Sequence, residues 1–180
     1  MALSARLRPG ETIGDRVVKV DHAGEHGAVS IYTAQRWVAR WRAPDLVEEL
    51  DRFLAHERRH RSIFAAELQS RGKSRCKSFH LCGFGGLALG ILTGLMGRQA
   101  IAATTVAVER VVLRHLREQI SELEGADIPA VGAIRQIIAD EEQHHDLARN
   151  QVHEHSLAAR LIDPVVTVST ETVIWLGMKL

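Results

Sequence analysis

The chain has 180 residues, 46% of them hydrophobic and 25% charged, and its formal net charge is +1. This length fits one domain, and the composition excludes a disordered charged tail. The small net charge argues against nucleic-acid binding, because few cations are left over to pair with phosphates. Two cysteines are too few for a disulfide framework.

Helical periodicity and the low aromatic content indicate an all-α chain. The first helix is expected to begin at Asp15 as its N-cap and to end near Arg42. Residues 45–48 have the pattern of a capping box and begin a second helix that ends near Gly72. These two helices form a first predicted hairpin, residues 13–72.

A basic linker separates this hairpin from an uncharged, glycine-rich stretch at 79–97; its cations are Arg71, Lys73, Arg75 and Lys77. A third helix is expected over 100–124, and Asp127 begins a fourth that runs past His145. These two helices form a second predicted hairpin, residues 100–155. The last stretch, 157–180, is an apolar helix with an interruption at Pro164.

Four glutamates occupy apolar helix stripes, where a carboxylate without a partner is unfavourable: Glu25, Glu57, Glu109 and Glu141. The first two are 32 positions apart, and so are the last two. Each interval has a helix breaker near its midpoint. Residues equidistant from the turn of an antiparallel hairpin lie at the same height, here about 24 Å along each helix from the turn. Each hairpin therefore places two carboxylates side by side.

The second glutamate of each pair is followed three residues later by a histidine, in Glu57-x-x-His60 and Glu141-x-x-His144. Side chains at this spacing share a helix face, so both can reach one metal ion. Two single glutamates and two Glu-x-x-His pairs are the ligand set of ferritin-like di-iron and di-manganese bundles. One such motif alone is typical of a solvated face, but the repeated interval favours the metal site.

The fourth motif allows a second register, Glu142-x-x-His145. The stripe that contains Glu141 and His144 is more apolar, and the 32-residue interval agrees with it. We therefore predict Glu141 and His144 as the inward-facing pair.

Three segments together resemble the demethoxyubiquinone hydroxylase family of ubiquinone biosynthesis: 21–28 (DHAGEHGA), 106–109 (VAVE) and 140–146 (DEEQHHD). The resemblance implies a single ferritin-like di-iron domain over 1–180, a four-helix bundle of two hairpins plus two apolar, membrane-interfacial helices. It implies an O₂-dependent monooxygenase that hydroxylates the ring of a polyprenylated demethoxybenzoquinol. It also implies two iron ions and NADH as the electron donor.

By the same resemblance, the iron ligands are Glu25, Glu57, His60, Glu109, Glu141 and His144. Glu57 and Glu109 are among the candidates for bridging the two ions, a choice that the sequence leaves open. Many members of the family carry His-Tyr where this sequence has His115-Leu116. If that tyrosine assists electron transfer in them, this chain works without it.

His22 and His115 are candidates for orienting a ligand or passing protons, and a histidine bonded to backbone is the alternative for both. Gly24 and Gly27 flank Glu25 inside a helix, where glycine is unfavourable. Close backbone packing, a π-bulge or a plain kink would each explain them.

The stretch at 79–97 is long enough to span a membrane. A single crossing, however, would place the first two glutamates and the last two on opposite sides. We therefore expect it to lie in the membrane interface, with the basic linker against anionic headgroups. Gly86, Gly90 and Gly94 offer a smooth face for helix packing.

The first nine residues lack the apolar core of a signal peptide, so export is not expected. We expect a peripheral protein on the cytoplasmic face of a bacterial inner membrane, or on the matrix side of a mitochondrial one. The expected partners are the prenylated quinone, O₂, the membrane surface, an accessory lipid-binding protein and further copies of the chain. The alternatives are a ferritin-like ferroxidase or peroxidase without an organic substrate, and a non-catalytic quinone- or lipid-binding protein.

Overall fold

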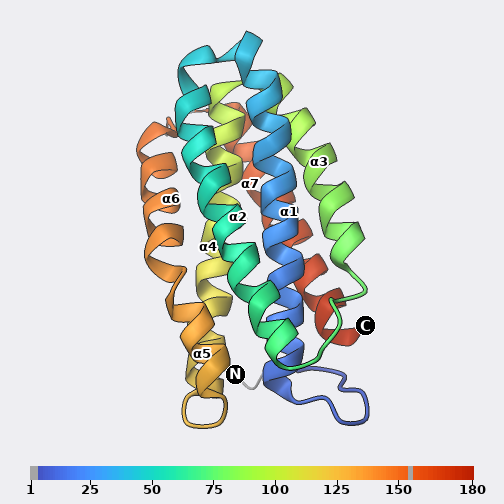
Figure 1. The fold of residues 1–180 in the computed structure, drawn as a ribbon. Coiled ribbons are helices and arrows are strands. Elements are labelled where there is room, and N and C mark those ends of the chain that lie inside the picture. The colour runs from blue at the N-terminus through green and yellow to red at the C-terminus, as the bar shows by residue number, and fades with distance from the viewer. Residues whose placement is uncertain (1–3, 154–155) are drawn as a thin grey trace.

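The computed structural model describes residues 4–153 and 156–180, which form an all-α bundle without strands in these ranges (Figure 1). The prediction of an all-α bundle with two additional apolar helices is confirmed. The elements in chain order are α1 (Ile13–Arg42), η1 (Pro44–Leu46), α2 (Val47–Ser70), α3 (Phe79–Met96), α4 (Arg98–Leu123), α5 (Ile128–Arg135), α6 (Ile138–Gln151) and α7 (Leu157–Lys179).

The first hairpin consists of α1 and α2, and its predicted caps were wrong at both starts. Thr12 is the N-cap of α1, and Asp15 is the third helical residue, whose carboxylate accepts from the Thr12 backbone N–H. This reciprocal pair satisfies two backbone donors. No capping box forms at 45–48, because Asp45 pairs with Arg98 across the top of the bundle and α2 begins without a side-chain cap.

The second hairpin consists of α4, α5 and α6. Asp127 caps α5 as predicted, since its side chain accepts from the backbone N–H of Ala130. The single fourth helix that was predicted is in fact broken between Arg135 and Ile138. At the break, the N–H groups of Gln136 and Ile137 bond to carbonyls three residues back, which tightens the chain into a turn.

Helix α3 packs along α1 through glycines, as predicted. A Cβ added at Gly86 would lie 2.3 Å from the Gly27 carbonyl oxygen, and one at Gly90 would lie 2.4 Å from that of Ile31. The two backbones therefore touch, and close packing explains Gly27. An added Cβ at Gly24 would meet nothing within 4 Å, and α1 is α-helical on both sides of it, without a π-bulge.

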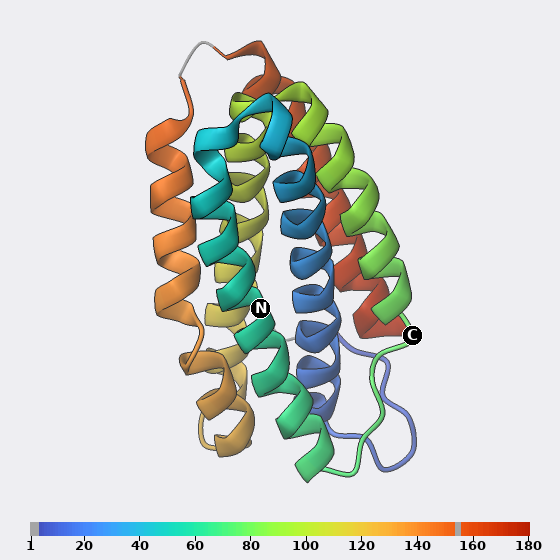
Figure 2. The same ribbon diagram turned by 45° about the horizontal axis from the view of Figure 1, so that its top comes forward.

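Helix α7 packs against α4 and runs through Pro164 without the predicted interruption. Helices α3 and α7 lie side by side on one flank of the bundle (Figure 2). Both expose large apolar side chains to solvent, among them Phe84, Leu92, Leu161 and Trp175. By length and hydropathy alone, α3 and residues 159–179 qualify as candidate membrane spans, a test that core helices also pass.

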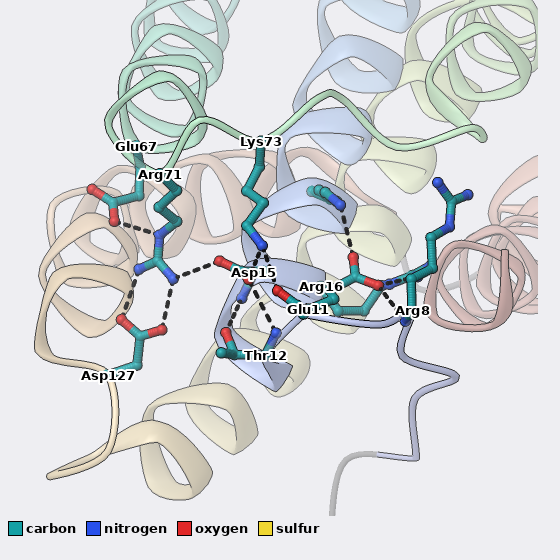
Figure 3. Close-up of polar contacts among 11 residues, drawn as sticks. Arg8, Glu11, Thr12, Asp15, Arg16, Glu67, Arg71, Lys73 and Asp127 are labelled. Carbon is teal, nitrogen blue, oxygen red and sulfur yellow. Dashed lines mark hydrogen bonds and ion pairs between the residues drawn. The ribbon is translucent and has the colours of Figure 1, made fainter.

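The lower end of the bundle is held by paired charges (Figure 3). The Arg71 guanidinium binds Asp127 at 2.7 Å and Asp15 at 3.3 Å, so it joins α2, α5 and α1. Lys73 also binds Asp15, at 2.9 Å. Two of the linker cations that were expected to face lipid headgroups are therefore paired with carboxylates of the bundle.

Candidate metal centre

The bundle core brings together the six predicted ligand side chains, which come from four helices and are at most 6% exposed. Glu25 lies on α1, Glu57 and His60 on α2, Glu109 on α4, and Glu141 and His144 on α6. The equal spacing of each glutamate from its hairpin turn explains why the four carboxylates meet at one height.

The six side chains form two overlapping groups whose donor atoms lie within 4.8 Å of one another. One group contains Glu25 and His60, the other contains Glu109 and His144, and both contain Glu57 and Glu141. Glu57 and Glu141 are thus common to both groups, whereas Glu109 belongs to one group only, so these side chains could hold two neighbouring cations.

The donor atoms of the two histidines point at the shared carboxylates. Nδ1 of His60 lies 2.8 Å from Glu141 Oε1, and Nδ1 of His144 lies 3.2 Å from Glu57 Oε1. Within the described residues, three buried carboxylate oxygens of the site have no hydrogen-bond partner, namely Glu25 Oε2, Glu57 Oε1 and Glu141 Oε2. Buried polar atoms are rarely left without partners, and this donor set fits two iron or manganese ions.

The remaining ring nitrogens of both histidines are held by groups that the sequence analysis missed. Nε2 of His60 donates to Asp140 Oδ2 at 2.9 Å, and Nε2 of His144 is bonded to His56 Nδ1 at 3.0 Å. Such contacts fix the ring orientations and keep Nδ1 of each histidine directed at the carboxylates. His56 directly precedes Glu57, and Asp140 directly precedes Glu141. This position next to a predicted ligand was the feature of the sequence that could have identified them.

Tyr32, the one tyrosine of the chain, is also part of this site. It lies seven residues after Glu25, on the same face of α1, and its hydroxyl donates to Glu109 Oε1 at 2.7 Å. Its part in the site was not predicted, although a spacing of seven residues from Glu25 indicates a shared helix face.

The electrostatics of the site show a shortage of positive charge. Burial and the neighbouring carboxylates raise the pKa of Glu25, Glu57 and Glu109 well above the usual range. Burial alone would lower the pKa of His60 and His144, but the carboxylates beside them raise it to about 9. Protons therefore balance the carboxylates in the absence of cations, and metal binding would displace them.

A cavity of about 410 Å³ leads from the flank between α3 and α7 to the four glutamates. Its wall is mostly apolar and includes Leu89, Val112 and Ile174. Gly24 lines it as well, which accounts for the open space beside that glycine. A planar ring with an apolar tail fits a cavity with a polar end at the glutamates and an otherwise mostly apolar wall.

Residues 12–177 match the family described as ubiquinone biosynthesis protein COQ7. The chain belongs to this family. The resemblance to the demethoxyubiquinone hydroxylases is thereby confirmed, and the match covers all six predicted ligands of the COQ7-family site.

Three relatives in the COQ7 family have similar identity. The mitochondrial "NADPH-dependent 3-demethoxyubiquinone 3-hydroxylase" of Dictyostelium discoideum is 31% identical over 92% of this chain and 76% of its own length. The "3-demethoxyubiquinol 3-hydroxylase" of Rhodospirillum rubrum is 30% identical over 92% and 77%. The mitochondrial protein of Mus musculus, named like that of Dictyostelium, is 30% identical over the same shares.

The other histidines considered from sequence lie outside the two donor groups of this COQ7-family site. The His22 ring stacks on Phe79 with centroids 5.0 Å apart. His115 is bonded to Glu171 of α7 at 3.0 Å and lines the cavity. Leu116 is buried in the apolar core.

The alternative register at the fourth motif is excluded by geometry. Glu142 points outward and binds Arg117 at 2.7 Å, and His145 bonds to Asp146 at 3.0 Å near the surface. Glu141 and His144 face inward, as predicted.

Proposed function

We propose that this protein is a di-iron monooxygenase that hydroxylates the ring of a polyprenylated demethoxybenzoquinol in ubiquinone biosynthesis. One observation carries the proposal: the cavity joins the apolar flank of α3 and α7 to the buried carboxylate cluster. The names of the COQ7-family relatives supply the reaction.

In this proposal, Glu25, Glu57, His60, Glu109, Glu141 and His144 hold two iron ions. Bound iron supplies the activation of O₂ and the transfer of one oxygen atom to the ring. The chain supplies a rigid donor set, since Asp140 and His56 orient the two imidazoles and Tyr32 orients one carboxylate of the site.

The apolar cavity wall excludes water and lets the prenyl tail leave between α3 and α7. The exposed apolar residues of both helices then face lipid acyl chains, including Phe84 on α3 and Leu161 on α7. Because Gly83 lies beside His26 and Gly94 beside Val38, α3 stays against α1 along its length. This arrangement supports a peripheral position at a bacterial inner or mitochondrial membrane, rather than a crossing by α3 alone.

The electron donor is proposed to be a reduced nicotinamide nucleotide. We expected NADH from sequence, whereas the names of the Dictyostelium and mouse relatives specify NADPH. Parallel assays with both nucleotides would decide between them.

The decisive experiment uses protein loaded anaerobically with ferrous iron. With a reduced nicotinamide nucleotide, O₂ and a short-chain demethoxyquinone, the wild type should release a ring-hydroxylated product, detected by mass spectrometry with ¹⁸O₂ as the oxygen source. Glu109→Ala should not, while Glu142→Gln, the adjacent outward-facing acid, should be as active as the wild type. Iron oxidation without any hydroxylated product would instead indicate a ferroxidase, and failure to bind iron would indicate a quinone- or lipid-binding protein.

The membrane position is tested separately by flotation with liposomes. Phe84→Glu and Leu161→Glu should each reduce the bound fraction, because both place a charge on the exposed apolar flank. Recovery of wild-type protein entirely in the soluble fraction would contradict the peripheral position.

A further inference from the structure

The cavity contains a second polar place, apart from the six metal donors. Asp21 of α1 and Gln119 of α4 both line it. The Gln119 side-chain amide donates to Asp21 Oδ1 at 2.9 Å. The pair therefore joins the two helices across the inner part of the cavity.

Two atoms of this pair remain without a partner. Asp21 Oδ2 and Gln119 Oε1 are both buried and make no hydrogen bond within the described chain. Gln119 itself is only 3% exposed. A buried acceptor without a partner is destabilising by roughly 1–3 kcal/mol. A role limited to joining α1 and α4 explains Asp21 Oδ1 and the Gln119 amide nitrogen, but leaves the other two atoms unexplained.

The position of Asp21 fits a substrate that also reaches the metal donors. Asp21 precedes Glu25 by four residues, which is about 6 Å along the helix axis and on the same face. One six-membered ring with oxygen substituents can therefore contact both. Two other polar side chains of the cavity wall are less available, since His115 is bonded to Glu171 and the Ser169 hydroxyl donates to the Val166 carbonyl.

We propose that Asp21, held by Gln119, is a substrate-positioning residue whose Oδ2 accepts a hydrogen bond from a ring hydroxyl of the reduced substrate. This inference rests on the proposed function and adds a preference for one redox form. A carboxylate only accepts hydrogen bonds, so it attracts the hydroxyl of a quinol and repels the carbonyl oxygen of the corresponding quinone.

The experiment measures binding to metal-free protein under anaerobic conditions, so that it does not depend on turnover. The probes are a demethoxybenzoquinol with a short isoprenoid tail and its oxidised quinone, followed by tryptophan fluorescence. Burial raises the pKa of Asp21 to about 7, so the titrations are run at about pH 8, where the carboxylate form prevails.

Wild-type protein should bind the quinol more tightly than the quinone. Asp21→Asn replaces one acceptor by a donor at nearly the same size, so quinol binding should weaken about tenfold or more, while quinone binding should be unchanged or tighter. Ser169→Ala is the matched control on the same cavity wall. Because its hydroxyl is already satisfied by backbone, it should leave both affinities within about twofold.

Gln119→Met provides a second variant of similar volume that leaves Asp21 without its donor. It should also reduce the ratio of quinol to quinone affinity, by a smaller factor than Asp21→Asn. If both variants keep the wild-type ratio while lowering the melting temperature, the pair is purely structural and the inference is overturned. In the iron-loaded enzyme, Asp21→Asn should raise KM for the quinol more than it lowers kcat.

The proposed function and the role of Asp21 are contradicted by different results. If the wild type neither binds the quinol nor hydroxylates it, the proposed function fails. If the wild type does both, and Asp21→Asn binds the two redox forms as the wild type does, only the role of Asp21 fails.

Discussion

The protein contains two clusters of buried charge that are built in opposite ways. At the lower end, the four acids of the cluster each have a cationic partner: Glu11 binds Arg16 and Lys19 at 2.7 Å, Asp127 and Glu67 bind Arg71, and Asp15 binds Lys73 (Figure 3). At the centre, four carboxylates share two imidazoles and leave donor atoms without partners. The lower cluster balances its charges within the chain, whereas the centre has more acidic than cationic side chains and could hold metal cations.

The pKa values follow the same division. Burial alone would raise the pKa of Glu11 and of Asp15. Hydrogen bonds from Arg16 and Lys19 to Glu11, and from the Thr12 backbone and Lys73 to Asp15, lower both values to about 2. At the centre, burial and like charge raise the pKa of Glu25 and Glu57 instead. Charge in one cluster therefore stabilises the fold, and charge in the other opposes it until metal binds.

The largest expected effect is that of metal on stability. Anaerobic ferrous iron at 100 to 1,000 times its Kd should stabilise the folded protein by about 3–4 kcal/mol. Differential scanning calorimetry measures this as a rise in Tm. Glu57→Gln, which removes a carboxylate shared by both donor groups, should abolish most of the rise. Equal shifts in the wild type and Glu57→Gln would contradict the assignment.

The next effect is the response of the lower cluster to acid. A carboxylate whose pKa is lowered in the folded state stabilises it above the unfolded value near 4.5, and this stabilisation is lost as the pH falls toward about 2. For Glu11 it amounts to on the order of 2 kcal/mol. Urea denaturation of metal-free protein should show a deficit of this size for Glu11→Gln at pH 7, which disappears near pH 2. A deficit independent of pH would show that packing, not charge, is responsible.

Replacing Arg71 tests how much its guanidinium contributes to the free energy of unfolding through the lower cluster. Arg71→Ala should lower the free energy of unfolding by about 2 kcal/mol, because it leaves Asp127 and Glu67 without their cation. Arg52→Ala is the matched control, since its pair with Glu48 is exposed and worth about 0.5 kcal/mol or less. If chemical denaturation shows the same loss of unfolding free energy in Arg71→Ala and Arg52→Ala, the buried and exposed ion pairs do not differ in their contribution to stability.

The smallest expected effects are changes in the free energy of unfolding that have opposite signs in the two clusters. In metal-free protein, Glu25→Gln should raise the free energy of unfolding by about 1 kcal/mol, because it removes a buried acid that lacks a cation. Asp127→Asn should lower it by about 1 kcal/mol, because it weakens a pair that is satisfied. A loss of stability in both variants would contradict the division of the charges into two kinds.

Much of the centre was predictable because it depends on regular geometry. The equal intervals between glutamates fixed their common height, and the i, i+3 spacing put His60 and His144 on the inner faces. The orienting contacts of His56 and Asp140 were missed, because they depend on how far neighbouring helices are rotated about their own axes. Sequence periodicity on one helix carries no information about that rotation.

The errors at helix boundaries have a similar cause. Asp15 and Asp45 are both acceptable N-caps, yet one is the third residue of its helix and the other pairs with Arg98 in a distant segment. Pro164 lies inside α7 without ending it, and the break before Ile138 has no proline or glycine at it. For α1 the local capping box with Thr12 decides the start of the helix, and in the other places long-range contacts and packing outweigh local preference.

The glycine contact between α1 and α3 has a mechanical consequence. The carbonyl oxygens of Gly27 and Ile31 lie against Gly86 and Gly90 of α3, so at these two positions the helices meet through their backbones rather than through long side chains. Because of this contact, we expect α1, which carries Glu25, and α3, which forms one wall of the cavity, to move together. A bulky lipid would then be admitted more easily by a displacement of α7, which lines the opposite wall.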